Sequence, residues 1–201
     1  MKSFLFCCLF GTFLATGMSL ECKICMEYGQ NCTDYWTKTC DAKEDTCVMY
    51  QTEVIGVPLS ITFTATACGT SDTCHLDYVE TNLHNELTVR AKRACCMGDE
   101  CQTLPPPVLE PQVHRPNGLQ CPGCIGLTST ECNEYLVSCQ GTENQCMTIT
   151  GKNREFLFRE MSFKGCASES LCTLFEKKFW RFLKESEVDV KCTPAVPKTS
   201  Q

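Results

Sequence analysis

Cysteine is the residue type in this chain with the clearest potential for chemistry, because 20 of the 201 residues are cysteine. Thiols at this density either bind a metal ion or pair as disulfides. Two Cys-x-x-Cys pairs, which begin at Cys22 and Cys121, have a spacing that suits zinc. The adjacent Cys95 and Cys96 suit a disulfide pattern better than one tetrahedral site, and the chain begins with a signal for the oxidising secretory route. We therefore expect disulfides, with no metal site and no cofactor.

The first nineteen residues have the composition of a secretory signal peptide. Lys2 supplies a positive charge, residues 4–14 are largely apolar, and small residues follow. The apolar run is too short for a membrane-spanning helix, which disfavours the alternative of an uncleaved anchor. Cleavage near Ser19 would remove Cys7 and Cys8, which leaves 18 cysteines and a net charge of −7, from 17 basic and 24 acidic residues.

The other end of the chain carries no hydrophobic tail after Cys192, so we expect no lipid anchor. No other stretch is apolar for long enough to span a bilayer, and we expect a soluble, secreted, extracellular protein. The composition is mildly acidic, with 18 Lys and Arg against 24 Asp and Glu. Nucleic acid and anionic membranes attract basic surfaces, so neither is expected as a main partner.

The cysteines fall into two sets with nearly the same spacing. Successive intervals in the first set, which starts at Cys22, are 3, 7, 8, 7, 21, 6, 21, 1 and 5 residues. The intervals in the second set, which starts at Cys121, are 3, 8, 7, 7, 20, 6 and 20 residues. Seven successive intervals agree to within one residue, which indicates an internal duplication.

A proline-rich segment, residues 102–120, separates the two sets and holds five of the nine prolines. Proline disfavours helices and central strands and favours extended polyproline geometry, so we interpret residues 103–120 as a semi-rigid linker. The expected organisation is a signal peptide (1–19), a first domain (20–102), the linker (103–120), a second domain (121–193) and a C-terminal tail (194–201).

The residues between the cysteines predict β-hairpins. Ile61, Phe63 and Ala65 alternate with threonines, which is the period of a half-buried strand. The expected hairpins join residues 48–54 to 59–66 through a turn at 56–58, and residues 147–150 to 156–158 through a turn at 151–153. Hairpins that project from a group of disulfides make a finger-like domain.

Each domain has roughly 70–80 residues, a size at which an apolar core alone gives little stability. Nine disulfides, each contributing about 2–4 kcal/mol through the unfolded state, would supply the remainder. Spacing alone does not determine which cysteines pair. The expected fold class is all-β, small and disulfide-rich, with two domains in tandem.

The first domain resembles the three-finger, snake-toxin-like family of lymphocyte antigen 6 and the urokinase receptor. The resemblance rests on Leu20-Glu21-Cys22-x-x-Cys25 at its start and on Cys95-Cys96-x-x-x-x-Cys101 at its end. Two features depart from the family pattern. Gln102 follows the final cysteine, where the family usually has Asn, and the second domain stops at Cys192 without a fifth disulfide.

The resemblance implies a disulfide pairing for both domains. The implied pairs in the first domain are Cys22–Cys47, Cys25–Cys32, Cys40–Cys68, Cys74–Cys95 and Cys96–Cys101. The implied pairs in the second domain are Cys121–Cys146, Cys124–Cys132, Cys139–Cys166 and Cys172–Cys192.

The mature chain as a whole resembles the gamma-type phospholipase A2 inhibitors, which are anchorless tandem members of this family. The residues that carry this resemblance are Pro116-Asn117-Gly118-x-x-Cys121-Pro122-Gly123-Cys124-x-Gly126, then Cys139-x-Gly141-Thr142-Glu143-x-x-Cys146, then Lys164-Gly165-Cys166. It implies an inhibitor that captures a secreted phospholipase A2 by protein–protein contact, and it also implies self-association into a homo-oligomer.

No set of residues predicts catalysis. His75, His84 and His114 are scattered, and none lies in a metalloprotease or serine-hydrolase motif. We therefore expect that the protein is not an enzyme. Asn31, followed by Cys32 and Thr33, forms a glycosylation sequon, although cysteine in its middle position is an uncommon context.

Two segments are candidates for partner binding. Residues 175–184 combine four cations with five large apolar residues, and their spacing predicts a short amphipathic helix. Phe179, Trp180 and Arg181 would form its contact surface; the alternative is a helix that packs its aromatic side chains on its own domain. The linker residues Leu104, Val108 and Leu109 would form a pre-extended docking strip, unless the linker is only a spacer.

The function expected first is therefore inhibition of a secreted phospholipase A2. The alternative is a soluble receptor-like or adhesive three-finger ligand with a different protein partner. A toxin-like, channel-modulating activity is disfavoured by the tandem domains and the acidic charge.

Overall fold

We describe the fold from a computed structural model. The structure describes residues 19–56, 60–84, 87–98, 100–111, 115–126, 132–153, 160–177 and 186–198. In these residues no helix is both long enough and apolar enough to cross a membrane.

Strands make up most of the described chain, which confirms the all-β prediction. The elements of the N-terminal half are β1 (Glu21–Tyr28), β2 (Trp36–Thr39), β3 (Thr46–Ile55), β4 (Ser60–Gly69), η1 (Ser71–Thr73), β5 (Tyr78–His84), β6 (Leu87–Cys96) and α1 (Glu100–Thr103). Those of the C-terminal half are β7 (Pro116–Gly126), β8 (Tyr135–Gln140), β9 (Glu143–Asn153), β10 (Glu160–Ser168), α2 (Glu169–Glu176), β11 (Ser186–Pro194) and β12 (Val196–Pro197).

Nine disulfides cross-link the chain within each unit. They join Cys22–Cys47, Cys25–Cys32, Cys40–Cys68, Cys74–Cys95, Cys96–Cys101, Cys121–Cys146, Cys124–Cys132, Cys139–Cys166 and Cys172–Cys192. These are the pairs that the family resemblance implies. Most of these cysteines are buried, and their sulfur atoms form much of the core of each unit, in which Ile24 and Val137 are among the few buried aliphatic side chains.

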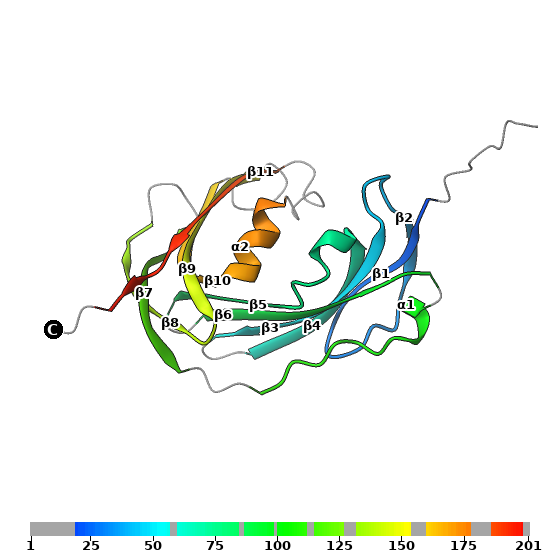
Figure 1. The fold of residues 1–201 in the computed structure, drawn as a ribbon, viewed down its shortest axis with the longest axis horizontal. Helices are drawn as coiled ribbons and strands as arrows, with labels where there is room; N and C mark the ends of the chain where they lie inside the picture. The colour runs from blue at the N-terminus through cyan, green and yellow to red at the C-terminus, as the bar shows by residue number, and fades with distance from the viewer. Residues whose placement is uncertain are drawn as a thin grey trace, which may run out of the picture.

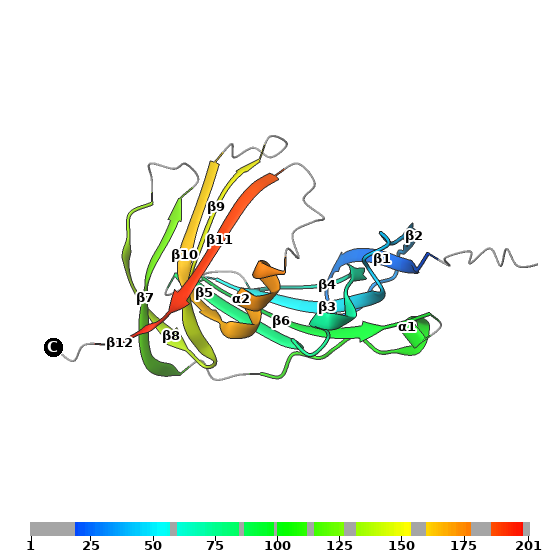
Figure 2. The same cartoon turned by 45° about the horizontal axis from the view of Figure 1, so that its top comes forward.

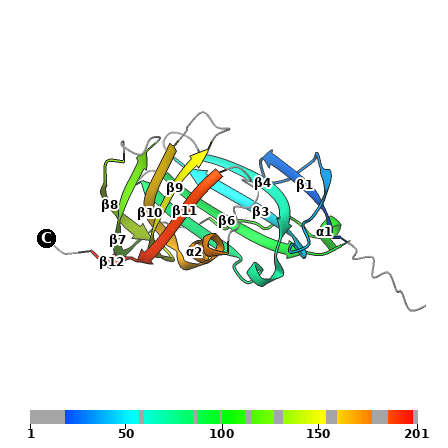
Figure 3. The ribbon, with the colours of Figure 1, turned by 90° about the horizontal axis from the view of Figure 1, so that it is seen from above.

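The strands of the two units form one continuous sheet, in the order β11-β9-β10-β5-β6-β3-β4-β1-β2. The junction is the antiparallel pair of β5 with β10, in which Asn82 lies opposite Cys166 and Thr81 lies opposite Ala167. In Figure 3, β1 lies at the opposite end of the molecule from β7, β8 and β12. The duplication therefore produces two units whose sheets join edge to edge.

The helix α2 belongs to the second unit but packs against the first. Leu174 is 2% exposed and clusters with Leu76, Val79 and Ala91 of the first unit. Lys177, at the end of this helix, forms an ion pair with Asp72 at 2.7 Å. Figure 2 shows α2 in the angle between the strands β9 to β11 and the sheet of the first unit, so the helix fills the corner where the units meet.

The helix α2 lies earlier in the chain than the helix predicted for residues 175–184, most of which lie outside the described residues. The helix begins after Ser168, whose side chain accepts a hydrogen bond from the amide of Leu171, and Glu169 lies in its first turn. Both features stabilise a helix N-terminus. Phe175 therefore lies in the last turn of the helix, where it packs on the second unit's core, and residues 178–185 lie outside the described residues.

The hairpin predicted in the first unit is confirmed, since β3 and β4 pair from Thr46 opposite Gly69 to Ile55 opposite Ser60. The turn predicted at residues 151–153 is wrong. These residues belong to β9, where Gly151 pairs with Met161 of β10 on one side and with Val188 of β11 on the other. A strand with partners on both sides continues through residues that favour turns, because pairing outweighs local propensity.

The proline-rich segment ends earlier than its composition indicates. The strand β7 begins at Pro116, and its residues Leu119 and Gln120 pair with β12. Proline is tolerated as the first residue of a strand, where its missing N–H removes no ladder hydrogen bond. Residues 104–111 remain extended and run along the sheet face opposite α2, as Figure 1 shows.

Candidate functional site

The proline-rich residues 104–111, which we call the strap, begin at a closed loop. The disulfide Cys96–Cys101 ties the end of β6 to α1, and the amide of Leu104 donates to the carbonyl of Glu100 at 2.9 Å. Leu104 then packs against the disulfide core of the first unit. The start of the strap is therefore anchored to the same group of disulfides that holds the strands.

The middle of the strap is anchored by two buried polar side chains of the sheet. Gln51 of β3 is 3% exposed and accepts a hydrogen bond from the amide of Leu109 at 2.7 Å. Arg90 of β6 is 6% exposed and donates from Nη1 to the carbonyl of Glu110 at 2.7 Å. The strap is therefore docked on the sheet, which a simple spacer would not require.

Strand geometry explains why these side chains reach the strap. Neighbouring residues in a strand point to opposite faces. Ala91 belongs to the buried cluster that includes Leu174 of α2, so Arg90 points to the other face, where it meets Glu53 across the β3–β6 pair. The Arg90 Nε and Nη2 atoms both lie 2.5 Å from Glu53 Oε2, so the guanidinium is held between the sheet and the strap.

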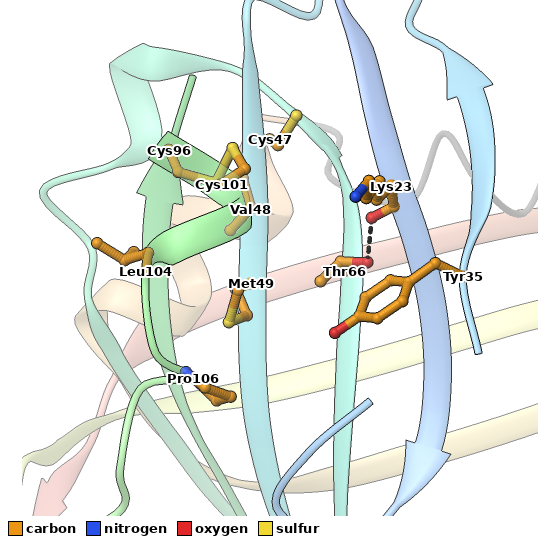
Figure 4. A pocket seen from close by; sticks show the side chains of 10 residues that line it. All are labelled: Lys23, Tyr35, Cys47, Val48, Met49, Thr66, Cys96, Cys101, Leu104 and Pro106. Carbon is orange, nitrogen blue, oxygen red and sulfur yellow. Dashed lines mark hydrogen bonds between the residues drawn. A yellow bond between two sulfur atoms is a disulfide. The ribbon is translucent and has the colours of Figure 1, made fainter. Parts of the chain in front are cut away.

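A pocket lies beside the strap, between it and the strands β1, β3 and β4. Figure 4 shows Lys23 and Tyr35 on one side of this pocket, Leu104 and Pro106 on the other, and Met49 between them. Further lining comes from Cys47, Val48, Thr66, Cys96 and Cys101. The lining is mostly apolar, with one ammonium group and one phenol at its side.

The wall that carries Lys23 is held by Thr66. The Thr66 hydroxyl donates to the carbonyl of Lys23 at 2.6 Å and accepts from the amide of Cys25 at 2.8 Å. These bonds connect β1 to β4 where β1 changes its pairing partner from β2 to β4. The pocket wall therefore has a defined position relative to the strap.

The surface formed by the strap and this pocket is exposed and apolar. Val108 is 61% exposed and Tyr35 is 49% exposed, while Leu104, Pro106 and Leu109 are half-buried. The residues that line the pocket include no histidine and no carboxylate. Such a surface suits recognition of another protein by contact.

The structure describes three of the six candidate partner-binding residues. Leu104, Val108 and Leu109 lie together on the strap. Phe179, Trp180 and Arg181 lie outside the described residues. Sequence reasoning missed Tyr35, Gln51 and Arg90, which reach the site only through strand pairing and through the docking of the strap.

A weak signal for Gln51 and Arg90 is present in the sequence. Gln51 directly follows the apolar and aromatic run Val48-Met49-Tyr50 of β3, and Arg90 and Glu53 carry opposite charges in strands that pair. A buried polar residue in a strand requires a partner. The identity of that partner, which is the strap backbone, could not be predicted without the tertiary structure.

A second exposed apolar area lies on the sheet face that also carries α2. Tyr28 is 85% exposed, Met26 is 69% exposed and Ile61 is 39% exposed, and Phe63 lies opposite Tyr28 in the β1–β4 pair. Residues opposite each other in antiparallel strands share a face. This area therefore lies on the other side of the sheet from the strap.

The sequon at Asn31 lies in the loop closed by the disulfide Cys25–Cys32. Asn31 is exposed, and the Thr33 hydroxyl donates to Glu27 Oε2 at 2.9 Å. Glu27 also accepts from the amides of Thr33 and Asp34, and these hydrogen bonds lower the pKa of its carboxyl group. A carboxylate that accepts three hydrogen bonds favours its ionised form.

The fold and the disulfides define a class of proteins: disulfide-rich β-proteins built from tandem three-finger units. Residues 117–194 match the family model described as the u-PAR/Ly-6 domain, and residues 20–103 match the model described as phospholipase A2 inhibitor. The two matches fall on the two units of the duplication.

Comparison with curated proteins shows the family. The chain is 79% identical to a phospholipase A2 inhibitor gamma subunit of Elaphe climacophora and 67% identical to phospholipase A2 inhibitor NAI of Notechis ater, over all 201 residues and the full length of each relative. It is 33% identical to phospholipase A2 inhibitor PIP of Malayopython reticulatus, over 88% of this chain and 88% of the relative. The chain belongs to the phospholipase A2 inhibitor family, which confirms the resemblance found in the sequence.

Proposed function

We propose that this protein inhibits a secreted phospholipase A2 by binding it directly, without catalysis of its own. The high identity to relatives named as phospholipase A2 inhibitors supports the target class. The observation that supports a contact mechanism most strongly is the docked strap, which presents Val108 at 61% exposure beside an apolar pocket.

We place the main contact on the strap and the adjacent pocket. The strap is rich in proline and is already held on the sheet, so little conformational entropy is lost when a partner binds it. Tyr35 and Val108 offer exposed apolar area, and Lys23 supplies a positive charge at the side of the pocket. A partner with an apolar protrusion flanked by an acidic group fits this surface.

The first test measures inhibition and direct binding of the oxidised mature protein against a panel of purified secreted phospholipases A2. Val108→Asp should weaken binding at least tenfold, because it places a charge in an apolar contact. The matched control is Leu136→Asp, since Leu136 is 64% exposed on β8 of the other unit, and its affinity should stay within twofold of wild type. Binding that Val108→Asp leaves unchanged would remove the strap from the contact.

The absence of binding to every enzyme of the panel would contradict the proposed function. The alternative would then be a soluble receptor-like or adhesive ligand with another extracellular protein partner. The same panel tests the prediction that Phe179, Trp180 and Arg181 contribute to binding, because Trp180→Ala should weaken the complex while the disulfides remain intact.

We propose that the protein is secreted and that its mature chain begins near Leu20. The apolar N-terminal run and the eighteen cysteines that pair after it support this proposal. We propose boundaries of 20–102 for the first domain and, because β7 begins at Pro116 and β12 pairs with it, 116–197 for the second in place of the expected 121–193. Self-association into a homo-oligomer stays a prediction of the family resemblance, and sedimentation of the purified protein tests it.

We also propose that Asn31 carries an N-linked glycan. The residue is exposed, and the sequon is complete with Thr33. Treatment of the secreted protein with a glycan amidase should lower its mass, and the variant Asn31→Gln should show no such change. An equal mass for treated and untreated wild-type protein would refute the modification.

A further inference from the structure

The strap contains few backbone groups that can hold it in place. Pro105, Pro106 and Pro107 have no amide hydrogen, so three successive positions cannot donate. Within the described part of the chain, the hydrogen bonds to residues 105–111 come from the side chains of Gln51 and Arg90. The docking of the strap therefore depends on two side chains of the sheet.

These two side chains are buried in a way that requires the strap. Gln51 and Arg90 are 3% and 6% exposed, and a buried polar group without a partner is destabilising. Gln51 accepts from Leu109, and one Arg90 donor is used by Glu110. Departure of the strap would leave both groups without these bonds, so the docked arrangement is favoured before any partner arrives.

Glu53 directs Arg90 toward the strap. It occupies the Nε and Nη2 atoms of the guanidinium, and the planar group then presents Nη1 to the carbonyl of Glu110. Planar guanidinium groups recognise their partners with fixed geometry. We call the Glu53–Arg90 pair the bracket, because it holds the strap at the carbonyl of Glu110. Gln51 holds the preceding strap residue, Leu109.

We propose that Gln51 and the Glu53–Arg90 pair are positioning residues that hold the strap in its binding conformation ahead of target capture. This inference rests on the proposed function and deepens it. If the strap were released, only the docked fraction of molecules would be competent to bind. The association rate would then fall in proportion to that fraction, while the dissociation rate of the formed complex would stay the same.

The test uses the full mature chain with two variants, each of which removes one of the side-chain contacts that hold the strap. Gln51→Leu removes the acceptor for Leu109, and the double variant Glu53→Leu with Arg90→Met removes both charges of the ion pair together. Glu80, which lies opposite Arg90 in the β5–β6 pair, keeps its hydrogen bonds from Thr142 and Tyr78 in this variant. Hydrogen exchange at the Leu109 amide reports release of the strap in the double variant, where its acceptor Gln51 is intact; in Gln51→Leu it reports the loss of the acceptor itself. Surface-based kinetics with a phospholipase A2 that binds wild type report the two rate constants.

Each of the two variants should accelerate hydrogen exchange at the Leu109 amide and lower the association rate constant about tenfold. The dissociation rate constant should stay within twofold of wild type. Val137→Ala, in the core of the second unit, is the control for lost stability, since Val137 is fully buried and does not touch the strap. It should leave the exchange at Leu109 and both rate constants unchanged.

The outcomes separate this inference from the proposed function. An association rate that is unchanged while Leu109 exchanges faster would overturn the positioning role, and so would an unchanged exchange rate. The proposed function would stand in both cases as long as wild type binds and Val108→Asp does not. A wild-type protein that binds no phospholipase A2 would overturn the proposed function, and the positioning role would be rejected with it.

Discussion

At the scale of single residues, two buried carboxyl groups lie where the units meet. Glu80 of β5 is 2% exposed and accepts from the amide and the hydroxyl of Thr142, each at 2.6 Å, and from the Tyr78 hydroxyl at 2.7 Å. Glu143 is 1% exposed and accepts from the amide of Gln140. The turn between β8 and β9 therefore packs against the first unit through the hydrogen bonds of Thr142 to the carboxyl group of Glu80.

The two carboxyl groups are placed in different surroundings. Burial raises the pKa of Glu143 to about 8, the nearby charge of Glu80 adds to the rise, and the hydrogen bond from Gln140 opposes it. The folded protein therefore keeps a proton on Glu143 at pH values where the unfolded chain, with an ordinary pKa of 4.5, has lost it.

This difference gives the free energy of unfolding a defined pH dependence. The contribution of Glu143 is fully present below pH 4.5 and is lost as the pH rises through about 8, because the folded state binds more protons in that window. Glu143→Gln should flatten this slope and stabilise the protein by about 1–3 kcal/mol at pH 8. Urea unfolding of wild type and of Glu143→Gln at pH 5 and pH 8 measures the effect. The same change in the free energy of unfolding between these two pH values in both proteins would contradict it.

At the scale of secondary-structure elements, α2 contributes Leu174 to a buried apolar cluster that joins the two units. A Leu174→Ala substitution should lower the free energy of unfolding by about 2–5 kcal/mol, because it leaves a cavity among Leu76, Val79 and Ala91. Denaturant unfolding of the oxidised protein gives this quantity. Glu176→Ala, an exposed change in the same helix, is the control and should alter it by less than about 0.5 kcal/mol. A similar result for both variants would show that α2 does not join the units.

Several elements could be predicted from the sequence because their signals are local. The cysteine intervals indicate two units, and the alternation of Ile61, Phe63 and Ala65 predicts β4. The start of α2 also has a local signal, the cap at Ser168, but the aromatic spacing that follows it favours a later helix. The extended conformation of the strap follows from its prolines.

The remaining features depend on contacts between distant residues. Nothing local in the sequence places Gln51 opposite Leu109, which is 58 positions away. The continuation of β9 through Gly151 depends on β10 and β11, and the early start of β7 depends on β8 and β12. The candidate site could therefore be assigned to the strap from sequence, whereas the pocket and the bracket could not.

At the scale of the whole molecule, the junction of β5 and β10 makes one sheet out of two units. Gly165 lies at this junction because the backbones approach closely there. A Cβ atom at position 165 would overlap the carbonyl oxygen of Asn82 and lie 2.8 Å from the Cα atom of Leu83. Backbone atoms cannot yield as a side chain does, so a larger residue would force the two strands apart.

Gly165→Ala should therefore destabilise the junction by about 3 kcal/mol or more. Hydrogen exchange resolved along the chain should show the loss of protection concentrated in β5 and β10. Gly69→Ala is the matched control, because its Cβ would meet the Val48 side chain inside the first unit and should leave the junction protected. Equal protection of β5 and β10 in Gly165→Ala and wild type would contradict the role of Gly165.

The disulfides stay within each unit, whereas the β-sheet runs through both units. Each of the nine disulfides joins two cysteines on the same side of the strap, while β5 with β10 and α2 with the first unit join the two sides without any covalent bond. A protease that cuts the chain near Val108 would therefore produce two cross-linked halves that remain associated as a complex. Halves made as separate polypeptides would assemble in the same way, so that fragments from different relatives could be combined to ask which half selects the target.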